Sequence, residues 1–232
     1  MRRPRFVYFD LDDTLLDHRE AERRALADLH THYAEPLAAH DPAAVHAVYR
    51  EHNVPLWRDY GRGHITKDEL KHLRFARTLA ALGVRLDPDE VSAVYLDRYS
   101  AHWQWADGAR DVFHAVADAL PVGVLTNGFK EQQRAKLAHL PDLAPRCAPG
   151  TVLIAEEIGA WKPTPEAFAI ATDAAGVAPQ DILYVGDSYH SDVLGGTAAG
   201  WHVAWVGGTA DRLPEGATLI DAWTDLTRLI SL

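Results

Sequence analysis

The stretch FVYFDLDDT, residues 6–14, is the strongest indication of the fold class in this sequence. Its first four residues are aromatic or β-branched with no polar alternation, as expected of a strand buried on both faces. The strand ends at Asp10, Asp12 and Asp13. Two carboxylates that lie two residues apart on an extended chain point the same way. Two negative charges at such a short distance repel each other unless a cation lies between them. Asp10 and Asp12 therefore predict a site for a hard divalent ion such as Mg²⁺; the alternative is a solvated acidic loop.

Strands and helices alternate along the chain from residue 104 onward. Apolar runs predict strands at 122–125, 152–154, 182–185, 203–206 and, at an edge, 218–220. Helical segments are expected near 109–119, 130–139, 165–175 and 191–199. Such alternation is typical of an α/β fold with a parallel sheet and helices on both faces. We expect residues 1–16 and 104–232 to form this core.

Residues 17–103 read as helix throughout. Asp-Pro pairs at 41–42 and 87–88 are typical helix starts, and residues 66–69 form a capping box. The first strand has no partner before residue 122, so residues 17–103 are predicted to be an inserted all-helical domain. Ligands of open α/β sheets bind at the carboxyl ends of the strands, which makes this insert a predicted lid. Its natural hinges are the two crossings, residues 15–18 and 103–107.

A second acidic motif, GDSYHSD, spans residues 186–192 and follows the apolar run at 182–185. If this strand is parallel to the first, Asp10, Asp12 and Asp187 converge at one edge of the sheet, and Asp192 lies near the start of the next helix. Three carboxylates without a cation would repel one another. Their convergence therefore strengthens the prediction of a metal site.

Two further segments suit an anion such as phosphate. Thr126, Asn127 and Gly128 follow a strand and offer a hydroxyl group and backbone N–H groups in a permissive turn. Lys162 stands before Pro163, which favours an extended conformation for the lysine. The alternatives are an ordinary Asn-Gly turn and a solvated surface lysine.

The composition excludes several classes of protein. The 232 residues are 47% hydrophobic and 24% charged, as in a folded domain, and the net charge of −10 argues against a nucleic-acid polymer as partner. We expect no membrane association, because no apolar run approaches the roughly 18 residues of a membrane span and the N-terminus lacks a secretory signal. The single cysteine, Cys147, excludes an internal disulfide and suits a cytoplasmic protein.

Other motif assignments fit less well. An EF-hand loop needs an entering helix and a glutamate at its twelfth position, where this chain has Ala21. A serine esterase would carry Gly-Asp-Ser near its N-terminus with a D-x-x-H downstream, whereas here the motif lies at 186–188 and no D-x-x-H follows. The sequence contains no zinc spacing, dinucleotide fingerprint or Walker loop.

As a set, DLDDT at 10–14, TN at 126–127, KP at 162–163 and GDSYHSD at 186–192 resemble the haloacid dehalogenase-like (HAD) hydrolase superfamily. The resemblance runs from residue 6 to about residue 206. It implies a Rossmann-like core with a helical cap inserted after the first motif, which is the arrangement that the segment pattern also predicts.

The resemblance implies a phosphatase that works through an aspartyl-phosphate. Asp10 would be the nucleophile, and Asp12 would act as general acid and then general base. Mg²⁺ would be held by Asp10, the backbone carbonyl of Asp12 and Asp187, with Asp192 in the outer shell. The dehalogenases of the superfamily lack the second aspartate of the first motif, so Asp12 favours a phosphatase. The phosphoryl oxygens would be held by Thr126, Asn127 and Lys162.

A narrower resemblance is to the pyrimidine nucleotidase branch of the superfamily. The segments that carry it are NVPLWRDY at 53–60, GHIT at 63–66, TNGF at 126–129 with Gln132-Gln133, and DVLGG at 192–196. It implies a small phosphorylated metabolite, a nucleoside 5′-monophosphate, as substrate. The alternatives are sugar phosphate, phosphoglycolate and acylneuraminate phosphatases, and beyond these a phosphomutase or a dehalogenase. We expect a monomer or a homodimer.

Two rivals from other classes can be compared by length and motif content. A receiver-type signalling domain also phosphorylates an aspartate beside Mg²⁺, but it has half this length and lacks the insert. A binding protein that has lost catalysis would not be expected to keep all four motifs. Candidate substrate contacts outside the motifs are His18, His190, Trp57, Trp103 and Trp105. The tryptophans could stack a base or a sugar, the alternative being packing.

Overall fold

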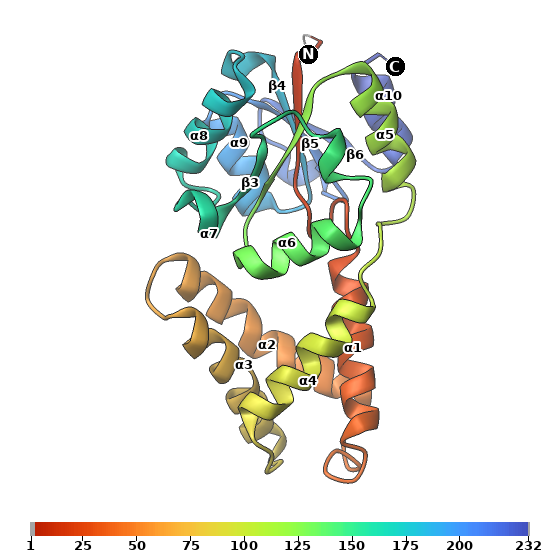
Figure 1. Cartoon of the computed structure of the whole chain (residues 1–232), viewed down its shortest axis with the longest axis vertical. Helices are drawn as coiled ribbons and strands as arrows, with labels where there is room; N and C mark the ends of the chain where they lie inside the picture. Colours follow the sequence, from red (N-terminus) through yellow and green to blue (C-terminus); the bar gives the residue numbers. More distant parts are fainter. Residues whose placement is uncertain (1–2, 232) are drawn as a thin grey trace. The chain divides into compact units, whose positions relative to one another are not determined.

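The computed structural model describes residues 3–231, so the outermost residues of the predicted core, 1, 2 and 232, lie outside the described residues. The chain forms two compact units (Figure 1). One runs from His18 to Trp103, and the other contains the described residues on either side of it. No helix within residues 3–231 combines the length and the apolar composition needed to cross a membrane.

The unit outside residues 18–103, called the core unit here, is built on a parallel sheet. Within the described residues its strands are β1 (Phe6–Phe9), β2 (Val122–Thr126), β3 (Val152–Ile154), β4 (Ile182–Gly186), β5 (His202–Val206) and β6 (Ala217–Ile220). Their order is β3-β2-β1-β4-β5-β6, and every neighbouring pair is parallel. The Rossmann-like α/β fold is therefore confirmed.

β1 lies in the middle of this sheet. Val7 is paired with Val122 on one side and with Leu183 on the other, and all four β1 residues are buried. The chain passes from β1 to β2 and β3 on one side and then returns to β4 on the other. Such a reversal opens a crevice at the carboxyl ends of the strands, where open α/β sheets bind ligands.

Helices cover both faces of the sheet. In Figure 1, α8 and α9 lie on one side of it, and α5 and α10 lie on the other. The helices of this unit are α5 (Ala109–Ala119), α6 (Lys130–His139), α7 (Ala155–Ile158), α8 (Pro165–Ala175), α9 (Gly195–Ala198) and α10 (Trp223–Leu229). Single turns lie at Ala144–Arg146, Pro179–Asp181 and Ala210–Arg212.

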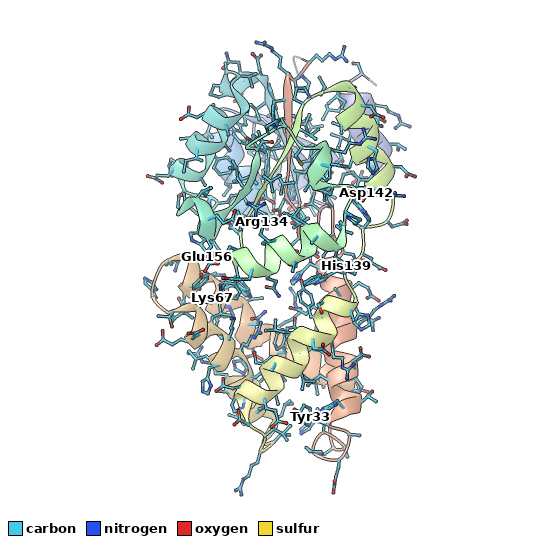
Figure 2. All side chains as sticks on the ribbon, viewed as in Figure 1. Tyr33, Lys67, Arg134, His139, Asp142 and Glu156 are labelled. Carbon is cyan, nitrogen blue, oxygen red and sulfur yellow. The ribbon has the colours of Figure 1, made fainter. Side chains whose placement is uncertain are left out.

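Polar contacts link α6, the helix that follows β2, to α7. The Arg134 guanidinium donates to Glu157 of α7 at 2.8 Å, and the backbone N–H of Lys130 donates to Glu156 at 2.6 Å. Beyond the end of α6, Asp142 accepts from Arg110 of α5 at 2.7 Å. Figure 2 labels Arg134, Glu156 and Asp142 on the outside of this unit. Exposed pairs of this kind add little stability.

Residues 18–103, called the helical unit here, contain α1 (His18–His32), α2 (Pro42–Gly61), α3 (Lys67–Leu82) and α4 (Pro88–Ala101). The predicted helix starts are confirmed. Asp41 and Asp87 accept hydrogen bonds from the first turns of α2 and α4, and Thr66 forms a capping box with Glu69. The helices pack around the rings of Tyr49, Phe75 and Tyr95, whose centroids lie 5.2–5.4 Å apart.

One predicted element differs in kind from the observed one. A helix is expected near residues 191–199, but Tyr189–Leu194 form a π-helical turn that leads into the short α9. A π turn contains one more residue than an α turn and is frequent at functional sites. Its consequence here is the placement of Asp192, described below.

Candidate active site

Asp10 stands directly after β1, at the carboxyl edge of the sheet. Its backbone N–H donates to the Val185 carbonyl at 2.9 Å, which ties the loop to β4. The chain then turns back on itself, because the Leu16 N–H donates to the Leu11 carbonyl at 2.8 Å and Asp13 has a φ of 59°. The side chain of Asp10 is buried at this turn, with 7% of the residue exposed.

Carboxylate oxygens of Asp10, Asp187 and Asp192 lie within 4.8 Å of one another. The predicted convergence of Asp10 and Asp187 is thus present. The expectation that the Asp12 side chain points the same way as that of Asp10 is wrong, because the chain turns after Asp10 instead of continuing as an extended strand. The third carboxylate of the group is that of Asp192, from the π turn.

Lys162 lies among these acids. Its Nζ donates to Asp10 Oδ1 at 2.9 Å, to Asp192 Oδ1 at 2.7 Å and to the Tyr184 hydroxyl at 2.5 Å. An ammonium carries three protons, so these three acceptors match its donors. Tyr184 in turn donates to the Leu125 carbonyl at 2.8 Å. Lys162 is 5% exposed, so the predicted alternative of a solvated surface lysine is wrong.

Burial dominates the electrostatics of this group. It raises the pKa of Asp10 above its usual range, although the Lys162 ammonium acts to lower it. Burial would lower the pKa of Lys162, yet the charges of Asp10 and Asp192 hold that pKa above its ordinary value. Burial and the Asp192 charge raise the pKa of Tyr184 well above its ordinary value, so its hydroxyl stays protonated.

The TN motif contacts the lysine loop. The Asn127 side chain donates to the Lys162 carbonyl at 2.9 Å and accepts from the Lys162 backbone N–H at 2.9 Å. This two-way amide pairing fixes the backbone from which the Lys162 side chain extends. The Asn127 amide group therefore positions Lys162. Thr126 is 1% exposed, and its hydroxyl donates to the Asn127 carbonyl at a long 3.2 Å.

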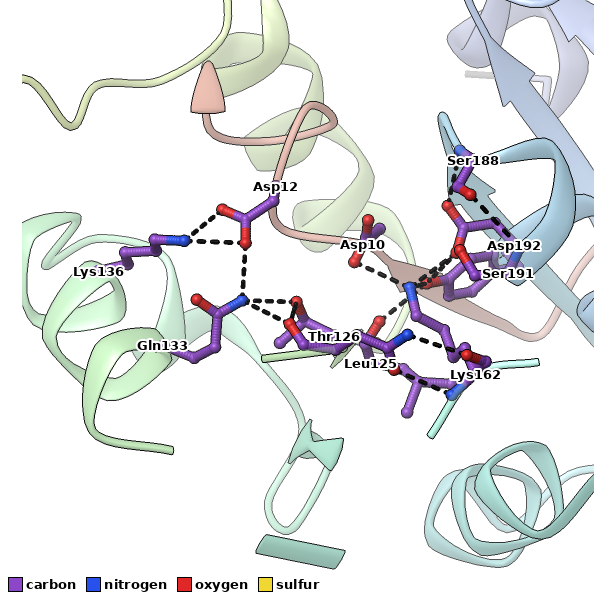
Figure 3. A network of polar contacts seen from close by, with 12 residues as sticks. Asp10, Asp12, Leu125, Thr126, Gln133, Lys136, Lys162, Ser188, Ser191 and Asp192 are labelled. Atoms are coloured by element: carbon purple, nitrogen blue, oxygen red, sulfur yellow. Dashed lines mark hydrogen bonds and ion pairs between the residues drawn. The ribbon is translucent and has the colours of Figure 1, made fainter. Parts of the chain in front are cut away.

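Asp12 is held by α6, on the other side of the first loop (Figure 3). Lys136 Nζ donates to both carboxylate oxygens of Asp12, at 2.7 and 2.8 Å. Gln133 Nε2 donates to Asp12 Oδ2 at 2.9 Å. The roles of Gln133 and Lys136 are not predicted from the sequence; the available signal is their spacing of three residues on a helix after the TN motif, which places them on one face.

Asp192 is fully buried, and its oxygens are bonded on both sides. Oδ1 accepts from Lys162 and from the Ser191 hydroxyl at 3.1 Å, and Oδ2 accepts from the Ser188 backbone N–H at 3.0 Å. Gly186 permits this packing, because a Cβ there would lie 2.4 Å from Asp192 Oδ2. The GDSYHSD motif thus builds a turn around one carboxylate.

The five candidate contacts outside the motifs have varied surroundings. His18 Nδ1 is 2.5 Å from the Tyr99 hydroxyl within the helical unit, while His190 is exposed. Trp103 is 8% exposed and packs against Tyr99, which is the packing alternative. Trp57 and Trp105 are half-buried.

Comparisons with known proteins agree with this geometry. Residues 5–200 match the haloacid dehalogenase-like hydrolase family. The chain is 30% identical over 224 residues to pyrimidine 5′-nucleotidase YjjG of Escherichia coli, a match that covers 94% of this chain and 92% of that protein. It is also 30% identical over 207 residues to pyrimidine 5′-nucleotidase PynA of Streptococcus pneumoniae, covering 87% of this chain and 83% of that one.

A solved structure extends the comparison to the whole fold. The crystal structure of the HAD-hydrolase YfnB from Bacillus subtilis, bound to magnesium, superposes with a TM-score of 0.82 at 26% identity and covers 100% of both chains. The family match spans most of the sequence, and the relatives match nearly end to end. The chain therefore belongs to the haloacid dehalogenase-like hydrolase family and is an enzyme of that family.

Proposed function

We propose that the chain is a Mg²⁺-dependent phosphatase that hydrolyses a small phosphate monoester through an aspartyl-phosphate. The observation that carries this proposal is the position of Asp10. Its carboxylate is buried at the carboxyl end of the central strand, 2.9 Å from the Lys162 ammonium and beside two further carboxylates. These contacts support the assignment of Asp10 as the nucleophile, of Lys162 as the cation for phosphoryl oxygens and of the carboxylates as metal ligands.

The donor set fits Mg²⁺. Hard divalent ions prefer oxygen ligands, and Asp10, Asp187 and Asp192 offer carboxylate oxygens within 4.8 Å of one another. Lys162 pairs with two of these acids, so this ammonium and the three carboxylates together leave two formal negative charges. Asp10 and Asp187 would be direct ligands together with the Asp12 carbonyl. Asp192, whose oxygens are already bonded by Lys162, Ser191 and Ser188, would act from the outer shell.

The chemistry has two steps. In the first, an Asp10 oxygen bonds to phosphorus while the bond from phosphorus to the alcohol oxygen breaks, and Asp12 gives its proton to the departing oxygen. In the second, water attacks the same phosphorus while Asp12 accepts a water proton and the bond to Asp10 breaks. The products are the alcohol, inorganic phosphate and regenerated Asp10. Bound Mg²⁺ would neutralise the acids and let the anionic phosphate approach.

Lys162, Thr126 and the Asn127 backbone would hold the phosphoryl oxygens during transfer. Lys162 is pre-positioned for this role, because its backbone is fixed by Asn127 and its ammonium by Asp10, Asp192 and Tyr184. A phosphoryl oxygen would take the place of one of these acceptors. The Thr126 hydroxyl, whose hydrogen bond to the Asn127 carbonyl is long, would turn its proton to a second phosphoryl oxygen.

We propose a nucleoside 5′-monophosphate as the substrate and residues 18–103 as the substrate-selecting cap. The support is the pair of relatives named pyrimidine 5′-nucleotidases, each of which matches more than four-fifths of this chain. The sugar phosphate, phosphoglycolate and acylneuraminate alternatives share the chemistry of the core unit. They differ in the leaving alcohol, which the substrate panel below varies.

The test is phosphate release, with Mg²⁺, from a panel of nucleoside monophosphates, sugar phosphates and phosphoglycolate, with Asp10→Asn as the blank. We expect pyrimidine monophosphates to have the highest kcat/KM and chelation of Mg²⁺ to abolish turnover. Preference for another ester would overturn the nucleotide assignment and leave the phosphatase in place. Phosphate release that survives chelation would overturn the metal assignment, and no release from any ester would overturn the proposed function.

A further inference from the structure

The face of α6 that meets the first loop carries two polar side chains that the chemistry above does not use. Lys136 is 2% exposed, and its Nζ contacts both oxygens of Asp12 at 2.7 and 2.8 Å. Gln133 is 1% exposed and donates to the same carboxylate at 2.9 Å. Figure 3 shows both side chains reaching Asp12 from one helix. Because the two contacts leave Asp12 bonded at both oxygens, its carboxylate is held in one orientation.

Gln133 also connects Asp12 to the TN motif. Its Nε2 lies 2.8 Å from Thr126 Oγ1 and 3.0 Å from the Asn127 carbonyl, as well as 2.9 Å from Asp12. An amide nitrogen has two protons, so three acceptors share two donors. When Thr126 Oγ1 accepts from Gln133, its own proton points elsewhere, here to the Asn127 carbonyl at a long 3.2 Å, and from there it would turn to a phosphoryl oxygen. One amide therefore orients both the hydroxyl and the carboxylate.

The backbone is adapted to this contact. Gly128 has a φ of 134°, and a Cβ there would lie 3.0 Å from Gln133 Cδ and 3.2 Å from its Nε2. A side chain at residue 128 would push the glutamine away from Thr126. Residue 128 is thus glycine for two reasons: its positive φ disfavours other residues, and a Cβ would collide with the Gln133 side chain.

Stability alone does not explain a buried lysine at this place. Burying the Lys136 ammonium removes its charge from water, while the Asp12 side chain stays 26% exposed, and well-packed apolar residues often serve a fold at least as well as a buried ion pair. Ordering a lysine side chain also costs rotamer entropy. The Lys136–Asp12 pair instead fixes the position of the Asp12 carboxylate, two residues after Asp10.

We propose that Gln133 and Lys136 are positioning residues for Asp12, with Gln133 coupling its position to that of the Thr126 hydroxyl. The inference rests on the proposed phosphatase function. Asp12 must reach the departing alcohol oxygen in the first step and the attacking water in the second, and misplacing a catalytic group by about 1 Å can cost about 100-fold in rate. The two α6 side chains act through Asp12 and need not touch the substrate.

The experiment compares Lys136→Met with Lys136→Arg, using Lys130→Met as the matched control. Lys130 is exposed at the start of the same helix, with its Nζ 4.0 Å from Glu131. Each variant is assayed with an alkyl phosphate, the best substrate of the panel, and with p-nitrophenyl phosphate. The p-nitrophenolate leaving group departs without needing a proton from Asp12.

We expect Lys136→Met to lower kcat for the alkyl phosphate about 10- to 100-fold with little change in KM. With p-nitrophenyl phosphate it should show a burst of about one p-nitrophenol per active site, because phosphorylation of Asp10 stays fast while water attack slows. Lys136→Arg should recover most of the rate, since a guanidinium also pairs with both oxygens of a carboxylate. Gln133→Met should show the same pattern, and Lys130→Met should match the wild type.

A double-mutant cycle separates positioning from a general loss of folded protein. In an Asp12→Asn background, Lys136→Met should have no further effect, because the group it positions is gone. The inference would be overturned if the effects of Lys136→Met and Asp12→Asn on kcat were fully additive. It would also be overturned if kcat of Lys136→Met fell equally for both substrates without a burst, or did not change. Failure of the proposed function itself is distinguishable, since the wild type would then release phosphate from neither substrate.

Discussion

Buried charge is balanced differently in the two units of the chain. In the helical unit, the buried Glu22 accepts from Arg50 at 3.2 Å and lies 3.4 Å from His46 Nε2 and 3.9 Å from His18 Nε2. In the core unit, Lys162 pairs with Asp10 and Asp192, and a carboxylate oxygen of Asp187 lies within 4.8 Å of oxygens of both acids. In the first cluster one carboxylate faces an arginine and two histidines, whereas in the second three carboxylates share one lysine, and under the proposed function Mg²⁺ would join them. We therefore expect the first cluster to matter for stability and the second for the proposed chemistry.

The largest expected effect comes from removing the cation of the core cluster. Lys162→Met should lower kcat/KM about 10²- to 10³-fold, because a preorganised donor to the phosphoryl oxygens is lost. It should also destabilise the Mg²⁺-free protein, since Asp10 and Asp192 then lie buried without their partner. Added Mg²⁺ should therefore raise the Tm of this variant more than that of the wild type.

The measurement pairs steady-state kinetics with thermal unfolding, with and without Mg²⁺, and again uses Lys130→Met as the control. A Lys162→Met protein that unfolds like the wild type and gains no extra stability from Mg²⁺ would show that the core cluster is balanced without a metal. The charge balance of the two clusters would then not differ.

A smaller effect is expected in the helical unit, and it depends on pH. Burial acts to raise the pKa of Glu22, but the hydrogen bond from His46 and the charges of His18 and Arg50 outweigh it, so this pKa is lowered on folding. The unfolded chain therefore binds the proton first as the pH falls. The stability that Glu22 contributes is complete above its unfolded pKa of about 4.5 and is lost as the pH falls through the lower folded value.

Glu22→Gln should accordingly destabilise the protein by about 2 kcal/mol at pH 7, and the deficit should shrink below about pH 4.5. Urea unfolding across this pH range provides the check, with Glu51→Gln, at an exposed position of α2, as the control. A deficit that is constant with pH would mean that the cluster does not stabilise through the charge of Glu22. Phosphatase activity at pH 7 should be retained in the folded fraction.

The architecture of the core could be predicted from the sequence because its signals are local. The apolar run before Asp10 defines β1, and every other strand predicted after residue 104 is found within one residue of its expected bounds. The order in which acids follow strands then places Asp10 and Asp187 at one edge. The same local logic accounts for the capped helix starts at Asp41, Thr66 and Asp87.

What could not be predicted depends on partners far apart in the chain. Asp12 and Lys136 are separated by 124 residues, and the direction of the Asp12 side chain follows from a turn that begins only after Asp10. Asp192 lies in a π turn that replaces the expected α-helix, and no local signal predicts its contact with Lys162, 30 residues away. The Asn127 amide likewise binds the Lys162 backbone, a pairing that no spacing rule indicates.

Locating the phosphoryl group on the protein tests the proposed aspartyl-phosphate at Asp10 without an intermediate assumption. Asp12→Asn should be phosphorylated by p-nitrophenyl phosphate and hydrolysed slowly, because the base for water attack is missing. Acid quenching, peptic digestion and mass spectrometry should then find one phosphoryl group on Asp10, and none in an Asp10→Asn, Asp12→Asn double variant. If the wild type turns over but the trapped variant carries no phosphoryl group on Asp10, or carries it on another residue, Asp10 is not the nucleophile.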